Sequence, residues 1–340
     1  MTAKKSLPGG QSNINYRVPL PADLAIQFGM REGTPVKLRQ PKPSRILFDQ
    51  KMWLDEDDIL NALSGRLPSI PHVLVTGDGF SIHTYANGDS LGSGRTRAGL
   101  PRVTVDELAD FFAKLAAIPI DELPLWPPGW PADGDSRGFL RGLVAYTDDE
   151  VRQPTWKLYG SILDALGYPV DAMARFAALI PDELTNRPFV LLHGDLHQRN
   201  LIRMPDGSLH VIDWELAMVG DPLHDLAIHL VRSCYSPRDQ QRFINSWAEA
   251  VGRVGKQVVN GLGRDLPLYI DYQRVRSVYT DVARTTDRYM ERTYSLSAAT
   301  KELCRIVGLG LKALGIDERP THQAAREALV NWRVGNSTRR

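Results

Sequence analysis

The chain has 340 residues, of which 43% are hydrophobic and 24% are charged, and this balance predicts an ordinary globular protein with one large or two medium domains. Its formal net charge of +1 gives no electrostatic reason to expect nucleic acid or an anionic membrane as a partner. No apolar run approaches the roughly 18 residues that a membrane-spanning helix needs, so we expect no membrane span.

The N-terminal part of the chain predicts short strands. Residues 14–18 alternate between apolar and polar side chains, as a half-buried strand does, and they follow a small polar loop, 9–13, that contains two glycines. Residues 35–39 predict a second strand. Lys37 and Arg39 lie on the same face of this strand, because side chains two residues apart in a strand point the same way.

A helix is predicted over residues 53–63. Glu56 recurs at helical spacing with three apolar side chains of this segment, so we expect it on or near the buried face. The other acidic residues are expected to be solvated or to face the positive end of the helix dipole, and these are Asp55, Asp57 and Asp58.

After two more strand-like runs, 73–75 and 80–85, the pattern breaks at 86–89 and then becomes helical. A helix-start signature at 104–107 opens an apolar stripe that continues to residue 115. Residues 119–142 are too rich in proline and glycine for regular structure. Further amphipathic helices are expected over 150–180 and 239–335.

The segment that carries chemistry reads HGDLHQRNLIRMPDGSLHVID, residues 193–213. The apolar run 190–192 predicts a strand, and the turn after it would carry Asp195 out of the core into a cleft. Two short runs flank Asp206-Gly207, a dipeptide suited to a tight hairpin turn. A hairpin would bring Asp213 back beside Asn200.

Asp195, Asn200 and Asp213 together predict a phosphoryl-transfer site. Transfer to a hydroxyl needs a carboxylate that accepts the hydroxyl proton and oxygen ligands for Mg²⁺ beside the phosphates. Asp195 can be the first, and Asn200 and Asp213 the second. Each residue alone is equally an ordinary loop residue, whereas the combination with the following Asp-Trp-Glu is far more specific.

Residues 190–227, VLLHGDLHQRNLI followed by VIDWELAMVGDPLHDLA, resemble the aminoglycoside phosphotransferase and choline kinase-like superfamily of small-molecule kinases, relatives of the protein kinases. The resemblance implies an α+β, bilobal, protein-kinase-like fold. A small β-rich N-lobe would span residues 1–85 and a larger, mainly helical C-lobe residues 86–340, with a hinge at about residues 83–88.

The resemblance also implies roles for residues of the C-lobe. Asp195 would be the catalytic base, Asn200 and Asp213 would bind Mg²⁺, and the catalytic loop would be supported by His193, His197 and Asp225. Trp214 and Glu215 match the choline kinase-like branch better than aminoglycoside kinases, which carry a glycine and an arginine after the metal-binding aspartate. These two residues are possible acceptor contacts.

In the N-lobe the resemblance implies a nucleotide site for ATP or GTP. The loop with Ser12 and Asn13 would cover the phosphates, although a plain flexible N-terminus is the alternative. Arg39, chosen over Lys37, would bind the α- and β-phosphates and pair with Glu56. His83 would lie near the gatekeeper position, and the backbone groups at Thr84 and Ala86 would meet the purine.

The acceptor is harder to predict. Residues 241–340 hold 17 Lys and Arg against 10 Asp and Glu, which argues against a polycationic acceptor. Four arginines interleaved with tyrosines would suit a neutral or anionic acceptor, and they are Arg274, Arg276, Arg284 and Arg288, with Tyr269, Tyr272, Tyr279 and Tyr289. Solvated helix faces are the alternative explanation.

We therefore expect a small-molecule kinase for an antibiotic-like acceptor, either an aminoglycoside or a nucleoside- or sugar-containing antibiotic, with a resistance or self-protection role. The alternatives are a metabolic kinase of the choline, amino-alcohol or sugar type and a non-catalytic pseudokinase. Two well-separated cysteines, Cys234 and Cys304, and the absence of a signal-peptide core predict a cytoplasmic protein. We expect a monomer or a homodimer.

Overall fold

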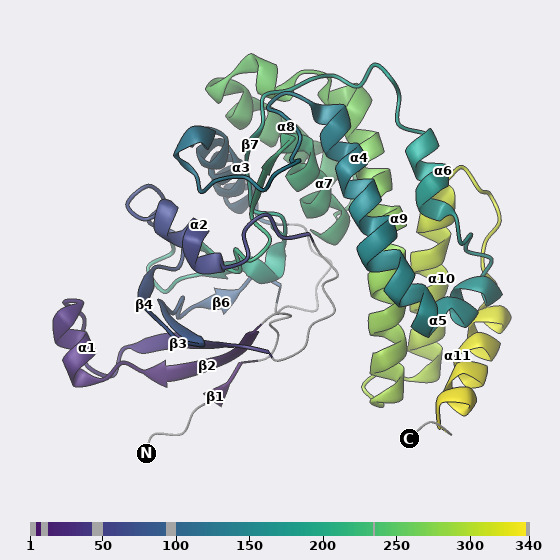
Figure 1. Cartoon of the computed structure of the whole chain (residues 1–340), viewed down its shortest axis with the longest axis horizontal. Coiled ribbons are helices and arrows are strands. Elements are labelled where there is room, and N and C mark those ends of the chain that lie inside the picture. The colour runs from purple at the N-terminus through teal and green to yellow at the C-terminus, as the bar shows by residue number, and fades with distance from the viewer. Residues whose placement is uncertain (1–4, 8–12, 43–49, 93–99, 234, 338–340) are drawn as a thin grey trace. The chain divides into compact units, whose positions relative to one another are not determined.

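The structure is a computed structural model that describes residues 5–7, 13–42, 50–92, 100–233 and 235–337. The chain divides into two compact units (Figure 1). Unit 1 comprises Met1–Leu47, Lys51–Trp130 and Arg187–Val259, and unit 2 comprises Phe48–Gln50, Pro131–Asn186 and Asn260–Arg340. These units do not coincide with the two predicted lobes, because 86–130 and 187–259 group with the N-terminal residues. The lobe boundary and the hinge stay predictions.

Unit 1 begins with a five-stranded antiparallel sheet of order β1-β2-β3-β5-β4. Its strands are β1 (Lys5–Ser6), β2 (Asn13–Pro19), β3 (Pro35–Pro41), β4 (Val73–Gly77) and β5 (Phe80–Thr84), and the short helix α1 (Ala22–Gln27) joins β2 to β3. Strands β2 to β5 lie where the sequence pattern predicts strands, whereas β1 was not predicted.

The two faces of this sheet differ. On one face Val36 of β3 packs with Leu20 and Ala25 in a small apolar core. On the other face β3 presents Lys37 and Arg39. Helix α2 (Glu56–Ala62) contacts β4 and is drawn beside it in Figure 1.

The rest of unit 1 contains two small sheets and three long helices. The sheets are β6-β8-β9, formed by Asp89–Ser90, Leu201–Arg203 and Leu209–Val211, and β10-β7, formed by Met218–Gly220 and Val190–Leu192. The helices are α3 (Arg102–Ala116), α7 (Pro222–Ser233) and α8 (Pro237–Val254), with short helical turns η1 (Ile120–Glu122), η3 (Gln198–Asn200) and η4 (Lys256–Val259).

The predicted hairpin is present as β8 and β9. The two strands pair antiparallel with Leu201 opposite Val211. Gly207 takes a positive φ of 86° in the turn, which glycine adopts without steric cost. Beyond the strands the Ile212 N–H donates to the Asn200 carbonyl at 3.0 Å, so the hairpin closes next to both predicted metal ligands.

Several helix starts differ from the prediction, among them that of α2, which begins at Glu56 and not at residue 53. Helix α3 begins at Arg102 after Pro101, so the signature at 104–107 lies within the helix. Helix α4 (Ser136–Tyr146) begins inside the segment predicted to be irregular. The Asp135 carboxylate caps α4 by accepting the Gly138 N–H at 2.8 Å, and the apolar stripe that follows favours a helix despite the upstream prolines.

Unit 2 is helical throughout its regular elements among the described residues. Its helices are α4, η2 (Thr147–Arg152), α5 (Gln153–Ala165), α6 (Ala172–Ala178), α9 (Leu262–Met290), α10 (Leu296–Ala313) and α11 (His322–Ser337). Helices α9 and α10 pack closely at Gly310, where any Cβ would overlap the Val278 side chain.

The arginine and tyrosine cluster of α9 does not form the acceptor surface that its composition suggests. The tyrosines are buried in unit 2, and they are Tyr269, Tyr272, Tyr279 and Tyr289. Arg274 and Arg284 pair with aspartates three residues earlier on the same helix. Amphipathic packing of α9, the alternative explanation, accounts for the buried tyrosines and for the paired Arg274 and Arg284, whereas burial lowers the pKa of Arg276 to about 10.

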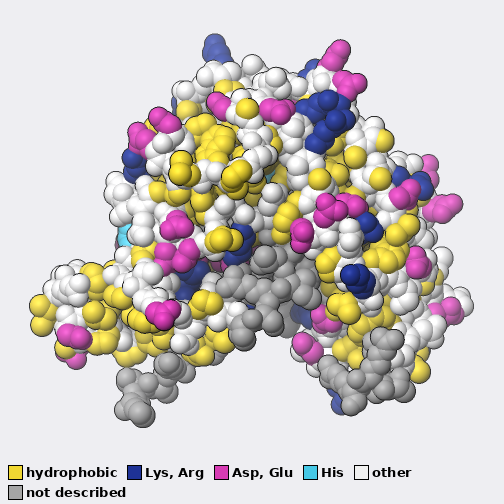
Figure 2. Space-filling view, viewed as in Figure 1, with side chains coloured by type: hydrophobic (Ala, Val, Ile, Leu, Met, Phe, Trp, Pro, Cys, Tyr) yellow, Lys and Arg dark blue, Asp and Glu magenta, His cyan; other side chains and the backbone are white. Residues whose placement is uncertain are grey.

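Among the helices in the described ranges, none has the length and apolar character needed to cross a membrane. Cys304 is a free thiol, and Cys234 lies outside the described residues. On the face shown in Figure 2, basic and acidic side chains lie among one another, in keeping with the net charge of +1.

Candidate active site

Asp195 lies in the loop that leaves β7. Its carboxylate is held at both oxygens: Arg232 Nη1 lies 2.6 Å from Oδ1, and His197 Nε2 lies 3.4 Å from Oδ2. Burial alone would raise the pKa of Asp195, but Arg232 and His197 lower it to about 2. The group is therefore an anion at neutral pH, and a hydroxyl can donate a hydrogen bond to it.

The loop turns at Gly194, which has a φ of 76°. A Cβ at this position would overlap the backbone carbonyl of Leu216, which follows the predicted metal-binding segment. Only glycine combines this φ with so close a backbone approach. The HGD motif therefore needs its glycine for packing as well as for the turn.

Asn200 and Asp213 lie where they can offer oxygen atoms to a cation. The Asn200 side-chain N–H donates to the Asp195 carbonyl at 3.0 Å, and no described residue donates to its Oδ1. Asp213 has a φ of 72°, a strained value for a residue with a Cβ. Burial raises its pKa to about 7 against the opposing charge of Lys37.

The side-chain oxygens of these two residues would fit a magnesium ion that is delivered with a nucleotide. Within the described ranges, no group of three or more His, Cys, Asp or Glu side chains could hold a metal. Mg²⁺ commonly uses one or two protein ligands and completes its shell with phosphate and water oxygens. The oxygen donors of Asn200 and Asp213 match that requirement.

His193 links the catalytic loop to the end of the hairpin. Its Nδ1 accepts the Asp195 N–H at 3.2 Å, and its Nε2–H donates to the Ile212 carbonyl at 3.1 Å. Burial lowers the pKa of His193 to about 4, so the ring is neutral and can accept at one nitrogen while donating at the other. The residue is thus placed to support the loop.

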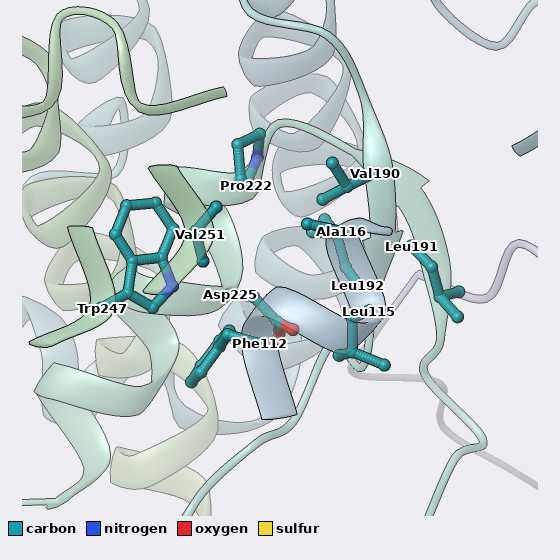
Figure 3. Close-up of a pocket in the computed structure, with 10 residues that line it drawn as sticks. All are labelled: Phe112, Leu115, Ala116, Val190, Leu191, Leu192, Pro222, Asp225, Trp247 and Val251. Carbon is teal, nitrogen blue, oxygen red and sulfur yellow. The ribbon is translucent and has the colours of Figure 1, made fainter. Parts of the chain in front are cut away.

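The side chain of Asp225, on α7, binds the backbone of the same loop. Its two carboxylate oxygens accept the N–H groups of His193 and Gly194 at 2.8 and 2.9 Å. Behind Asp225 lies an apolar cavity of about 10 Å³, in which Asp225 is the one charged lining residue (Figure 3). Burial raises the pKa of Asp225 to about 7, although both N–H groups oppose the rise.

Two further residues of α7 reach the loop, and sequence reasoning missed both. His229 Nδ1–H donates to the Leu196 carbonyl at 3.0 Å, and Arg232 contacts Asp195. Asp225, His229 and Arg232 are spaced i, i+4 and i+7, which places them on one face of the helix. The spacing D-x₃-H-x₂-R was the available signal.

A buried charge network lies beneath β3. Arg39 Nη2 lies 2.7 Å from Glu56 Oε2, and Arg39 Nη1 lies 3.0 Å from Asp57 Oδ1. His83 Nε2 lies 2.7 Å from the same Asp57 oxygen. Asp57 is 3% exposed, so the expectation that it is solvated was wrong: Glu56 and Asp57 pack against the sheet, whereas Asp58 in the same turn of α2 is exposed.

Glu56 also reaches the predicted metal-binding segment. Its Oε1 accepts the Trp214 N–H at 2.8 Å, while Oε2 binds Arg39. Burial would raise the pKa of Glu56, but Arg39, Lys37 and His83 lower it to about 2. The carboxylate therefore joins strand β3 to the residue after Asp213.

The residues predicted as acceptor contacts differ in position. Trp214 is 1% exposed, its indole N–H donates to the Val211 carbonyl, and its ring packs on Phe111. We correct the prediction, because a core side chain cannot meet an acceptor. Glu215 pairs with Lys51 at 3.0 Å, a partner that the sequence did not indicate.

The predicted purine-binding segment is partly engaged within the sheet. His83 is fully buried beneath Arg39. The Thr84 N–H donates to the His72 carbonyl at 2.9 Å, whereas no described residue hydrogen-bonds the backbone of Ala86. Asn13 begins β2, and Ser12 lies outside the described residues. Their nucleotide roles stay predictions.

Residues 5–262 match the model of the phosphotransferase enzyme family. The chain belongs to the phosphotransferase enzyme family. No curated protein matches the chain. Because the match spans more than half of the sequence and includes the catalytic loop, the hairpin and α7, the enzyme is a phosphotransferase with an alcohol group as acceptor.

Solved structures share the fold of this phosphotransferase. An ethanolamine kinase from Plasmodium vivax is 15% identical, with a TM-score of 0.59 over 95% of this chain and 84% of that chain. Aminoglycoside phosphotransferase APH(4)-Ia in a ternary complex with ADP and hygromycin B is 15% identical, with a TM-score of 0.53 over 92% and 94%. A macrolide 2'-phosphotransferase from Brachybacterium faecium is 16% identical, with a TM-score of 0.50 over 89% and 91%.

These relatives confirm the predicted α+β, protein-kinase-like fold. They also divide between kinases of amino alcohols and kinases of antibiotics. The family therefore fixes the reaction class of this phosphotransferase and leaves its acceptor open.

Proposed function

We propose that the chain transfers the γ-phosphate of ATP or GTP, with Mg²⁺, to a hydroxyl of a small, polar, antibiotic-like acceptor. The observation that carries the proposal is the grouping of Asp195, Asn200 and Asp213 around one loop and one hairpin. The His193 ring binds the Ile212 carbonyl and the Asp225 carboxylate binds the Gly194 N–H, and these contacts hold the grouping in place. Loop residues without a function would not need such support.

In this reaction a bond forms between the acceptor oxygen and the γ-phosphorus, and the bond from that phosphorus to the bridging oxygen breaks. Asp195 accepts the hydroxyl proton, and the nucleoside diphosphate leaves. A carboxylate with a pKa of about 2 is a weak base. It suffices because the transition state of phosphoryl transfer is loose, so orienting the hydroxyl matters more than early proton removal.

Asn200 Oδ1 and the Asp213 carboxylate would hold the metal ion. When bound, Mg²⁺ supplies positive charge beside the β- and γ-phosphate oxygens. Asp213 has a positive φ of 72°, next to the buried Trp214. A positive φ is strained for a residue with a Cβ, and such strain is often found at binding sites.

Either Arg39 or Lys37 would bind the nucleotide phosphates. Arg39 matches the family segment, but its guanidinium already faces the carboxylates of Glu56 and Asp57. Lys37 is half-buried on the same face of β3, and its charge acts on Asp213. Separate Lys37→Met and Arg39→Met variants decide the matter, since loss of the phosphate-binding cation raises KM for the nucleotide most.

An antibiotic acceptor would make the enzyme a cytoplasmic resistance or self-protection factor, acting as a monomer or homodimer. The fold is shared with kinases of antibiotics, which supports this role. The second candidate is a metabolic kinase of an amino alcohol or a sugar, supported by the fold of the ethanolamine kinase. With a base and both metal ligands present, a non-catalytic binding module is disfavoured.

The test measures ADP or GDP formation by the purified chain with ATP and GTP, over a panel of nucleoside, macrolide and aminoglycoside antibiotics, choline and simple sugars. Asp195→Ala should lower kcat by at least about a thousandfold and leave the nucleotide affinity within about threefold of the native value. Retained turnover would contradict the role of Asp195. Raised drug tolerance in a host that expresses the chain separates the antibiotic role from the metabolic one.

A further inference from the structure

Arg232 differs from the other two members of the α7 face that contacts the catalytic loop. Asp225 and His229 are both buried and bind loop backbone, at His193, Gly194 and Leu196. Arg232 is 29% exposed and binds a side chain, the carboxylate of Asp195. Because backbone contacts already hold the loop, this partly exposed arginine is not needed to shape it.

The guanidinium of Arg232 keeps most of its donors available. It uses Nη1 for Asp195 Oδ1, and its other N–H groups make no hydrogen bond with the described residues. None of its nitrogens is a buried atom without a partner. An arginine presents five N–H donors in a planar fork, so donors remain that face solvent beside the catalytic carboxylate.

The acceptor must come close to these donors. A hydroxyl that gives its proton to Asp195 lies within about 3 Å of a carboxylate oxygen. Arg232 Nη1 lies 2.6 Å from Oδ1 of that same carboxylate. Substituents on the carbon next to the reacting hydroxyl therefore lie within reach of the Arg232 fork.

Charge then decides which substituents are favoured. Arg232 lies at one oxygen of Asp195, and His197 lies at the other. An ammonium group next to the hydroxyl would meet a fixed positive charge, whereas a carboxylate or phosphate would replace water on the guanidinium with a bidentate contact. We propose that Arg232 selects an acceptor whose reacting hydroxyl lies beside an anionic group and disfavours amines.

This inference rests on the proposed kinase function and specifies its acceptor class. Suitable probes share a six-carbon skeleton and differ in charge: D-gluconate, D-glucose and D-glucosamine, with D-glucose 1-phosphate, whose phosphate lies on the carbon next to the 2-hydroxyl, to separate phosphate from carboxylate. The measurement is kcat/KM for ADP formation with Mg-ATP. For a probe that is not phosphorylated, the measurement is its inhibition of ADP formation with water as acceptor.

The native enzyme should prefer one of the two anionic probes over glucosamine by about tenfold or more, the effect of a charge-assisted hydrogen bond. Arg232→Gln should remove that preference, and Arg232→Glu should reverse it. The matched control is Arg253→Gln, an exposed arginine of α8 that pairs with Asp110 and should leave every ratio unchanged. The kcat/KM for glucose, the uncharged probe, measures any effect of the substitution on Asp195 that is the same for all probes.

Three results would overturn the proposal. The first is a native enzyme that shows no charge preference or prefers glucosamine. The second is an Arg232→Gln variant whose kcat/KM falls equally for all probes, and the third is an Arg232→Gln variant whose KM for ATP rises while the probe ratios stay unchanged. The proposed kinase function fails separately, through absent ADP formation with every probe and with water, or through ADP formation that persists in Asp195→Ala.

Discussion

Three side chains bind the backbone of the catalytic loop at four consecutive residues. Backbone groups at positions 193, 194, 195 and 196 are bound by Asp225, by the His193 ring and by His229. The side chains that make these contacts are buried, and a buried polar group left without a partner costs about 1–3 kcal/mol. These contacts hold the loop in the conformation in which the Asn200 side-chain N–H donates to the Asp195 carbonyl.

Gly194 provides the most local test of this arrangement. In Gly194→Ala the added Cβ meets the Leu216 carbonyl, and the positive φ is strained for alanine. We expect kcat to fall by at least about a hundredfold and the free energy of unfolding to fall by about 1–3 kcal/mol. Steady-state kinetics and urea unfolding measure the two effects.

The matched control for that substitution is Gly142→Ala. Gly142 lies within α4, and no atom lies within 4 Å of a Cβ built there. Alanine is favoured over glycine in an exposed helix by about 0.5–1 kcal/mol, so this variant should be slightly more stable and fully active. Equal losses in both variants would mean that the tight contact at Gly194 has no special role.

For single residues, the sequence predicts those contacts that are formed between residues close together along the chain. Asp195, Asn200 and Asp213 are separated by one loop and one hairpin, so their proximity follows from turn chemistry. Arg232 comes from a helix far along the chain, and its contact depends on how α7 docks. Asp57 was misplaced because its burial depends on packing between α2 and the sheet, which the helical pattern alone does not fix.

Among the elements, helix α2 has a connecting role. Its first residue, Glu56, binds Arg39 of β3 and the Trp214 N–H after β9. The next residue, Asp57, binds Arg39 and His83 of β5. A shift of α2 would therefore move the β3 cations and the Asp213 segment together, which couples the two halves of the predicted nucleotide site.

Glu56→Gln tests that coupling through its pH dependence. The native pKa of about 2 lies below the ordinary value of 4.5, so the charged group stabilises the fold above about pH 4.5 and loses this effect as the pH falls toward 2. We expect the variant to lose on the order of 3 kcal/mol of unfolding free energy at pH 7. The difference from the native protein should shrink below pH 4.5.

The control for this series is Glu249→Gln, because the Glu249 side chain is 80% exposed on α8. It should follow the native protein at every pH. A Glu56→Gln deficit that stays constant between pH 5 and pH 3 would mean that the lost contact is not ionic. Urea unfolding followed by tryptophan fluorescence at each pH supplies the measurement.

Element boundaries were predicted less well than element types. Strands β2 to β5, β7 and the β8–β9 hairpin lie where the sequence pattern places them, whereas β1, β6 and β10 were not predicted. Helices α3 and α4 begin elsewhere, since Pro101 and Asp135 start helices that the composition of the flanking segments obscured. Start signals compete locally, and the packing of the apolar stripe decides between them.

For the whole molecule, every described residue of the predicted site belongs to unit 1. The family match ends at residue 262, close in sequence to Val259, where unit 1 ends. The predicted site thus lies in one compact unit that is assembled from three segments of the chain, whereas the family match also includes residues 131–186 of unit 2. Binding of a nucleotide to this unit should stabilise it as a body, because its ligands come from strands, loop and hairpin together.

Thermal unfolding with AMP-PNP tests this expectation and the role of Asp213. Burial raises the pKa of Asp213 to about 7, so in the ligand-free protein the group is largely protonated below that pH and must lose its proton to bind a cation. The rise in Tm with Mg²⁺ and AMP-PNP should therefore grow between pH 6 and pH 8. AMP-PNP with EDTA should give a smaller rise with little pH dependence.

Asp213→Asn should lose the magnesium-dependent part of the rise in Tm, whereas Asp206→Asn, in the exposed turn of the same hairpin, should keep it. A magnesium-dependent rise that survives in Asp213→Asn would remove this residue from the metal site.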